Sequence, residues 1–337
     1  MKTVKNIGVI GAGSWGTTLA DLLARKNYPV TLWVYEQDLA ERMTSSRVND
    51  LYLPGFTLSE NLRFTSDLAE AVAGADLLLL VPPSQVMRRV LQQAAPHLGA
   101  ETLIVSASKG IENDSLQPMA EVITGCLGAE RGHSLVFLSG PSFAREVAAG
   151  MPTAVVAASA DAKAAAAAQD VFSTPSFRVY TNDDVIGVEL GGALKNVVAL
   201  AAGVSDGLGF GYNTRAALIT RGLAEMTRMG LALGANPATF AGLAGMGDLV
   251  LTCTGDLSRN RTVGMELGRG RSLDEILGNM NMVAEGVKTT LSAFQLAQKI
   301  GVDVPITEQM YRILYQNKDP RQAVSDLMLR ELKAETV

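Results

Sequence analysis

The first half of the chain alternates short apolar runs with stretches of helical periodicity. The run 77–81 is apolar throughout, a pattern typical of a strand in a parallel sheet that is covered on both faces. Eight strands are expected, at 7–10, 29–35, 62–65, 77–81, 103–107, 135–138, 154–157 and 178–181. Helices are expected between them at 17–25, 38–43, 67–73, 85–95 and the alanine-rich 161–172.

From about Asp184 the pattern changes to successive helices broken by Gly, Asn and Pro. They are expected at 185–203, 214–233, 237–243, 260–267, 273–277, 287–299, 305–315 and 320–329. The change predicts an α/β fold with a doubly wound sheet over 1–184, followed by an all-helical domain over 185–337.

A glycine-rich turn joins the first strand to the first helix. Gly11, Gly13 and Gly16 have the spacing of a dinucleotide fingerprint, in the strand–turn–helix context that it requires. Gly11 would permit the tight turn, Gly13 would let the backbone approach a pyrophosphate, and Gly16 would keep the helix close to the strand. The alternative is a glycine-rich turn in an ordinary α/β domain. The flanking strand and helix favour a Rossmann-type domain that binds a dinucleotide.

Glu36 follows the second strand, 20 positions after Gly16. An acidic side chain there commonly accepts hydrogen bonds from the adenosine ribose, and it would repel a 2′-phosphate. We therefore expect NADH to be used at least as well as NADPH. The alternative is that Glu36 points to solvent while Tyr35 stacks on adenine, which would give dual specificity.

Further candidates follow other strands: Lys109 after the fifth, and Gly140 and Ser142 after the sixth. The residues 82–84 follow the fourth. Because the carboxyl ends of parallel strands lie at one edge of a sheet, these positions predict a ligand site at that edge.

Composition narrows the chemistry. The chain has 337 residues, a net charge of −5, two cysteines and two histidines. A metal site needs several clustered ligands, so we expect no metal and assign proton transfer to Lys, Asp, Glu, Tyr or Cys. The net charge argues against nucleic acid as a partner. The N-terminus has no signal-peptide pattern and the apolar runs are too short to span a bilayer, so we expect a cytoplasmic protein.

Lys195 is the best candidate acid–base group. It lies in an apolar helical stretch in which Glu189 is the only other charged residue between 185 and 205. A buried lysine is costly unless it is paired or faces a polar site. The alternative is a lysine whose stem extends to the surface. Asp248, in a glycine-rich turn, could serve the same site or merely cap the next helix.

Ser258, Arg259, Asn260 and Arg261 place a hydroxyl, an amide and two guanidiniums at an expected helix start. Such a group suits a phosphate, through forked donors and the helix dipole. The alternative is a capped helix with a solvated basic turn.

Six ordered blocks resemble the bacterial NAD(P)-dependent glycerol-3-phosphate dehydrogenases, from about residue 7 to 315. They are GAGSWG at 11–16, YLPG at 52–55, SASKGIE at 106–112, SGPSFARE at 139–146, ELGGALKN at 189–196, and GMGDL at 245–249 with SRNR at 258–261. The resemblance implies interconversion of dihydroxyacetone phosphate and sn-glycerol 3-phosphate, which supplies phospholipid synthesis. It leaves a homodimer open.

The resemblance also assigns residues to ligands. It implies dinucleotide contacts at Ser14, Trp15, Tyr35, Tyr52, Lys109, Ala144, Arg259, Val283 and Glu285. It implies substrate contacts at Lys109, Gly140, Ser142, Lys195, Asp248, Ser258, Arg259 and Asn260, with Lys195 as the acid–base residue. Many relatives place His or Arg where this chain has Tyr35 and Glu36, so the adenosine-phosphate preference is open.

Two other functions fit the same features. A dehydrogenase of similar build could act on a sugar acid or a hydroxyacyl thioester, which substrate competition would reveal. A dinucleotide sensor without chemistry would show no turnover of dihydroxyacetone phosphate, and Lys195, Lys109 and Asp248 argue against it.

Overall fold

The computed structural model describes residues 3–278, 280, 284–332 and 334–335, and its chain divides into two compact units. The first unit contains the residues up to Lys109 and Met119–Val185, and the second contains Gly110–Pro118 and the residues from Ile186 onward. The domain boundary predicted from the sequence, after residue 184, would place Gly110–Pro118 in the first unit instead. The segment lies with the second because Ile111 is fully buried in that core and its carbonyl accepts a hydrogen bond from Ser292 Oγ, at 3.1 Å.

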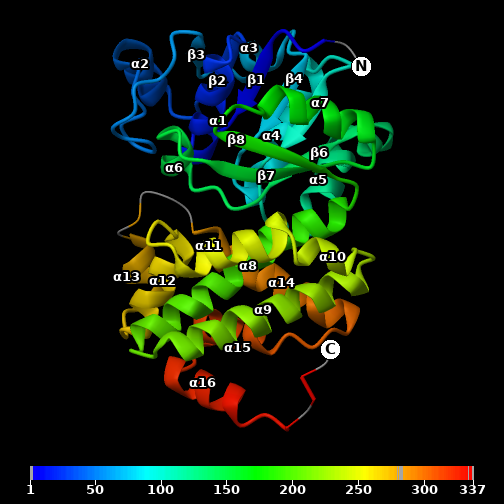
Figure 1. The fold of residues 1–337 in the computed structure, drawn as a ribbon. Coiled ribbons are helices and arrows are strands. Elements are labelled where there is room, and N and C mark those ends of the chain that lie inside the picture. Colours follow the sequence, from blue (N-terminus) through cyan, green and yellow to red (C-terminus); the bar gives the residue numbers. More distant parts are fainter. Residues whose placement is uncertain (1–2, 279, 281–283, 333, 336–337) are drawn as a thin grey trace. The chain divides into compact units, whose positions relative to one another are not determined.

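The first unit is built on a mixed sheet whose order, among the described residues, is β3-β2-β1-β4-β5-β6-β7-β8 (Figure 1). The first six strands are parallel and follow the order typical of dinucleotide-binding sheets. The strands are β1 (Ile7–Ile10), β2 (Val30–Trp33), β3 (Leu62–Thr65), β4 (Leu77–Leu80), β5 (Leu103–Ser106), β6 (Val136–Ser139), β7 (Thr153–Ala158) and β8 (Phe177–Asn182).

The strand β7 runs antiparallel to β6, and β8 runs parallel to β7. A parallel neighbour needs a crossover of a dozen or more residues, usually through a full helix. The connection from β6 to β7 contains only the five-residue helix α6 (Ala144–Ala148), whereas the parallel pair β7 and β8 is joined through the eleven-residue helix α7 (Ala162–Phe172).

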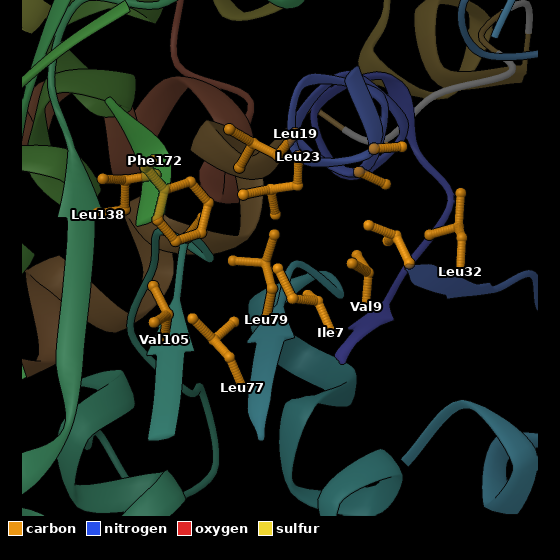
Figure 2. Close-up of a cluster of buried hydrophobic side chains, with 14 of the residues drawn as sticks. Ile7, Val9, Leu19, Leu23, Leu32, Leu77, Leu79, Val105, Leu138 and Phe172 are labelled. Carbon is orange, nitrogen blue, oxygen red and sulfur yellow. The ribbon is translucent and has the colours of Figure 1, made fainter. Parts of the chain in front are cut away.

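Helices pack on the sheet in two groups, since α1 contacts α6 and α7 whereas α4 contacts α3 and α5. Figure 2 shows Leu19 and Leu23 of α1 and Phe172 of α7 gathered over Val9 and Leu79 of the sheet, all wholly buried. Each such side chain contributes roughly 1.5–3 kcal/mol by its burial. Besides α6, the helices are α1 (Ser14–Arg25), α2 (Gln37–Ser46), α3 (Leu68–Val72), α4 (Met87–Ala94), α5 (Met119–Leu127) and α7 (Ala162–Phe172), with short 3₁₀ turns at Ser84–Val86, Ala95–His97 and Ala129–Ser134.

Among its described residues the second unit is helical, apart from an isolated bridge between Ile111 and Pro118. Its helices are α8 (Val185–Gly207), α9 (Tyr212–Ala232), α10 (Pro237–Phe240), α11 (Asp248–Thr254), α12 (Arg259–Gly268), α13 (Leu273–Gly278), α14 (Glu285–Ile300), α15 (Pro305–Gln316) and α16 (Pro320–Met328), with a π-helical turn, η4, at Leu243–Gly247 (Figure 1). The helices α5, α6 and α11 are not predicted from the sequence pattern.

Helix α8 forms the centre of this unit. Among the described residues it alone is long and apolar enough to cross a membrane, but 83% of that stretch is buried inside the fold, as in a core helix. Glycines bring it against α12: a Cβ on Gly203 would lie 2.0 Å from the carbonyl oxygen of Arg261, and one on Gly264 would lie 2.0 Å from that of Leu200. The two backbones therefore touch, which places the start of α12 close to α8.

Candidate functional site

The glycine-rich turn has the geometry that its three roles require. Gly11 has φ +110°, and a Cβ there would lie 2.9 Å from the Val81 carbonyl group. A Cβ on Gly16 would lie 1.9 Å from the carbonyl oxygen of Gly11, so only glycine allows α1 to start this close to β1. Gly13, the N-cap of α1, has no described atom within 4 Å of its Cβ position, which leaves space above the helix N-terminus for a phosphate.

A second group lies beyond β5 and β6, at the same edge of the sheet because these strands run parallel to β1. Gly140 has φ +136°, and a Cβ there would meet Val155 Cα at 3.0 Å. Its carbonyl oxygen accepts hydrogen bonds from Lys109 Nζ at 3.4 Å and from Ser142 Oγ at 3.0 Å. The structure thus brings Lys109, Gly140 and Ser142 together.

Tyr52 is held against the glycine-rich turn at its backbone and against Glu36 at its hydroxyl. Its carbonyl oxygen accepts a hydrogen bond from Ser14 Oγ at 2.6 Å, and its N–H donates to Asn49 Oδ1 at 2.9 Å. Its hydroxyl donates to Glu36 Oε1 at 2.8 Å. Burial, followed by the hydrogen bond and the charge of Glu36, raises the pKa of Tyr52 to about 12, so the phenol stays protonated as a donor.

Three other residues that the family resemblance assigns to the dinucleotide differ from one another in exposure and in contacts. Trp15 is half-buried and its ring lies 6.4 Å from that of Phe177, so it also covers the core. Tyr35 is 71% exposed and meets Trp33 edge to face. Ala144 starts α6, and its carbonyl oxygen accepts a hydrogen bond from Thr18 Oγ1 at 3.2 Å.

In the second unit, Lys195 is buried in α8 and paired. Its Nζ lies 2.5 Å from Asp248 Oδ1 and 3.0 Å from Thr252 Oγ1, and the residue is 8% exposed. The surface-directed alternative is therefore wrong. Thr252 in turn donates its hydroxyl proton to the carbonyl oxygen of Asp248, at 2.6 Å. Asp248 is therefore a counter-ion for the buried amine of Lys195, and such pairing offsets the cost of burying a charge.

Asp248 reaches Lys195 because the backbone before it packs tightly on α8. Asp248 is the first residue of α11 and Gly247 is its N-cap, so the alternative role as a helix cap is wrong. A Cβ on Gly191 of α8 would lie 2.5 Å from the carbonyl oxygen of Ala244 in the π-helical turn. Such turns often mark functional sites.

The start of α12 combines a cap with an ion pair. Ser258 is the N-cap and its Oγ accepts a hydrogen bond from the Arg261 N–H. The Arg261 guanidinium donates to Asp206 at 2.8 Å and to Asp256 at 2.9 Å, so the alternative of a solvated basic turn is wrong for this residue. The Arg259 residue is exposed as a whole, but protein atoms surround its guanidinium, and this desolvation lowers the pKa of the group while the charge of Glu285 opposes the shift.

Asn260 joins three helices. Its Nδ2 donates to Asn196 Oδ1 at 2.9 Å, and its Oδ1 accepts a hydrogen bond from the Gly286 N–H at 3.0 Å. Asn196 follows Lys195, and Gly286 follows Glu285, the first residue of α14. The Asn260 amide therefore joins the residue after Lys195, in α8, to the residue after Glu285, in α14. Val283 lies outside the described residues.

Sequence reasoning missed Asn196 and Thr252. Thr252 lies one helical turn after Asp248, so helical spacing could have found it, whereas Asn196 is adjacent to Lys195 and was signalled only by lying in the same sequence block. Burial raises the pKa of the neighbouring Cys253 thiol to about 12. Within the described part of the chain, no group of three or more His, Cys, Asp or Glu could hold a metal ion.

The chain resembles known proteins along nearly its whole length. Residues 6–165 match the family model of the NAD-dependent glycerol-3-phosphate dehydrogenase N-terminus, and residues 184–325 match that of its C-terminus.

Curated relatives include "Glycerol-3-phosphate dehydrogenase [NAD(P)+]" of Syntrophotalea carbinolica, 67% identical over 98% of this chain and 99% of the relative. The protein of the same name from Geobacter sulfurreducens is 65% identical, with the same coverage. The crystal structure of glycerol-3-phosphate dehydrogenase from Coxiella burnetii has a TM-score of 0.93 and 42% identity, over 98% of this chain and all of that one. On these matches, the chain belongs to the NAD-dependent glycerol-3-phosphate dehydrogenase family.

Proposed function

We propose that the chain interconverts dihydroxyacetone phosphate and sn-glycerol 3-phosphate with NAD(P)H. The observation that carries the proposal is the buried Lys195–Asp248 pair, linked through Asn196 and Asn260 to the start of α12. Family membership supplies the substrate class. The resemblance further implies that the enzyme supplies glycerol 3-phosphate for phospholipid synthesis, and the sequence composition favours a cytoplasmic protein.

Lys195 is the proposed proton donor. When bound, NAD(P)H supplies the hydride to C2 of the ketone. The Lys195 ammonium gives its proton to the C2 oxygen as that oxygen gains negative charge, which completes the alcohol. In the reverse direction neutral Lys195 accepts the hydroxyl proton. Asp248 and Thr252 hold Nζ in place for both transfers.

The start of α12 is the proposed phosphate site. Arg259 supplies a forked cation, Ser258 lies at the helix N-terminus, and Asn260 has a second Nδ2 hydrogen beyond the one given to Asn196. Holding the phosphate there would orient C2, and such positioning can lower a barrier by several kcal/mol. From the resemblance, Lys109, Gly140 and Ser142 are proposed as further substrate contacts.

The first unit fits a dinucleotide, with an uncrowded helix N-terminus at Gly13. We propose that NADH is used at least as well as NADPH. Glu36 is held by Tyr52 rather than turned to solvent, which supports a contact with the ribose hydroxyls. Arg42 is engaged with Asp38 at 2.5 Å and with Asp50 at 3.0 Å, which disfavours its use as a partner for a 2′-phosphate.

The activity is tested by following NADH and NADPH oxidation with dihydroxyacetone phosphate. Lys195→Met is expected to lower kcat by more than tenfold while leaving dinucleotide binding nearly unchanged. A variant that keeps more than about a tenth of the wild-type kcat would remove Lys195 as the proton donor. Sugar acids and hydroxyacyl thioesters serve as competitors, and turnover of these alone would favour the other dehydrogenase classes.

The cofactor preference is tested with Glu36→Arg. Replacing a carboxylate by a guanidinium should shift the ratio of kcat/KM toward NADPH by about tenfold or more, equivalent to about 1.4 kcal/mol. A wild type that favours NADPH tenfold, or a ratio that does not move in the variant, would contradict the preference.

A further inference from the structure

The side chain of Glu36 is not oriented by its own helix. Glu36 is the N-cap of α2, but its carboxylate makes no capping hydrogen bond to that helix. Instead, Oε1 accepts the hydrogen bond from the Tyr52 hydroxyl. A flexible glutamate side chain at the end of a strand can otherwise adopt several rotamers, so the phenol selects one of them.

Tyr52 can select this rotamer because its own backbone is anchored to the glycine-rich turn. The Asn49 side chain is fully buried and donates from Nδ2 to the Ala12 carbonyl oxygen and to Thr17 Oγ1, at 2.9 Å each. The same side chain accepts the hydrogen bond from the Tyr52 N–H, while Ser14 Oγ binds the Tyr52 carbonyl oxygen. The loop that carries Tyr52 is therefore attached to the turn on which the pyrophosphate would lie.

We propose that Tyr52 is a positioning residue that sets cofactor specificity through Glu36. Its hydroxyl binds one carboxylate oxygen of Glu36 and leaves the other directed to the adenosine ribose. The 2′ position of the ribose then lies beside a negative charge whose rotamer is fixed. The anchorage at Asn49 and Ser14 keeps this charge in register with the pyrophosphate site. The inference rests on the proposed dinucleotide site of the first unit.

The arrangement has a consequence for binding. A 2′-phosphate could escape a mobile carboxylate at little cost, because the side chain would rotate into solvent. Against a carboxylate held by a hydrogen bond, the phosphate must first break that bond, which to a charged group is stronger than between neutral partners. The protonated phenol maintains the hydrogen bond across the neutral pH range, since the pKa of Tyr52 lies near 12.

The test is a double-mutant cycle on binding, with no turnover required. Dissociation constants for NADH and NADPH are measured by quenching of protein fluorescence in the wild type, Tyr52→Phe, Glu36→Gln and the double variant. Tyr52→Phe keeps the ring and removes only the hydroxyl. Tyr315→Phe is the matched control, because it removes a phenol that donates to the Val287 carbonyl oxygen in the second unit.

We expect Tyr52→Phe to lower the ratio Kd(NADPH)/Kd(NADH) by about three- to tenfold, and tenfold corresponds to about 1.4 kcal/mol. The double variant should match Glu36→Gln alone, because Tyr52 acts through Glu36. Tyr315→Phe should leave the ratio unchanged. The inference is overturned if Tyr52→Phe weakens the binding of both cofactors equally or leaves the ratio unchanged. It is also overturned if the separate effects of Tyr52→Phe and Glu36→Gln on the ratio multiply in the double variant.

The two proposals fail in distinguishable ways. A wild type that binds NADPH more tightly than NADH contradicts the proposed preference, whatever the variants do. A wild type that prefers NADH with a ratio insensitive to Tyr52→Phe contradicts the positioning role alone. A wild type that prefers NADPH, with a ratio that Tyr52→Phe still shifts only when Glu36 is present, supports the positioning role and rejects the preference.

Discussion

The free energy of unfolding of the second unit should fall as the pH rises toward neutral, because of the buried residue Glu225 on α9. The residue is 3% exposed, and its carboxylate accepts hydrogen bonds from the N–H groups of Ile306, at 2.6 Å, and Thr307, at 3.1 Å, in the first turn of α15. Burial raises the pKa of Glu225 to about 7 from 4.5, although these hydrogen bonds and the charge of Arg228 oppose the shift. Desolvation therefore outweighs the favourable helix N-terminus.

The sign follows from proton binding. Between pH 4.5 and 7 the folded chain keeps the proton on Glu225 that the unfolded chain loses, so its stability declines with rising pH and levels off above 7. At 1.36 kcal/mol per pKa unit, the full decline is about 3 kcal/mol. Glu225→Gln removes the titration. The difference in unfolding free energy, wild type minus variant, should therefore fall by up to about 3 kcal/mol between pH 4.5 and 8.

The assay must report on the second unit. Both tryptophans, Trp15 and Trp33, lie in the first unit, so their fluorescence would miss the effect. Urea unfolding followed by far-UV circular dichroism, together with hydrogen exchange of the Ile306 and Thr307 amides, covers α15 directly. A difference that stays flat or rises with pH would refute the reasoning, since it would mean that the carboxylate stabilises the N-terminus of α15 as an anion.

Two further variants test the sites directly. Arg259→Ala should raise KM for dihydroxyacetone phosphate and also weaken dinucleotide binding; steady-state kinetics and a binding titration that leave both constants unchanged would remove Arg259 from the site. Asn49→Ala should destabilise the first unit by about 1–3 kcal/mol in urea unfolding followed by tryptophan fluorescence, because it leaves the buried Ala12 carbonyl oxygen and the Tyr52 N–H short of partners. An unchanged midpoint and slope would show that water replaces the amide.

The parts of the fold that depend on local pattern could be predicted from the sequence. The apolar run that became β4 and the fingerprint at Gly11–Gly16 need only neighbouring residues to specify strand, turn and helix. The reversal of β7 could not be predicted in the same way, because strand direction depends on how the short connection through α6 packs.

The candidate site residues also divide into those that a local pattern reveals and those that depend on contacts distant in the sequence. Lys195 stood out because its charge is unusual in an apolar helix, but the role of Asp248 depends on the close approach at Gly191, which no local pattern reveals. The pattern at 258–261 predicts Arg261 as a phosphate ligand, but its guanidinium pairs with Asp206, 55 positions earlier in the chain. Only the family resemblance points to Tyr52 as a site residue, because its contact with Glu36 joins two segments that no local pattern relates.

The placement of Gly110–Pro118 affects the order in which the chain can fold. The chain passes from the first unit to the second after Lys109, returns at Met119, and leaves again at Val185. During synthesis this segment emerges before β6–β8 are made and well before its own packing partners, such as Ser292. A first unit that folds during synthesis would therefore carry a nine-residue excursion whose apolar Ile111 belongs to a core that has not yet been made. A fragment ended at residue 184 would keep that excursion exposed, and the remaining fragment would lack a piece of its own core.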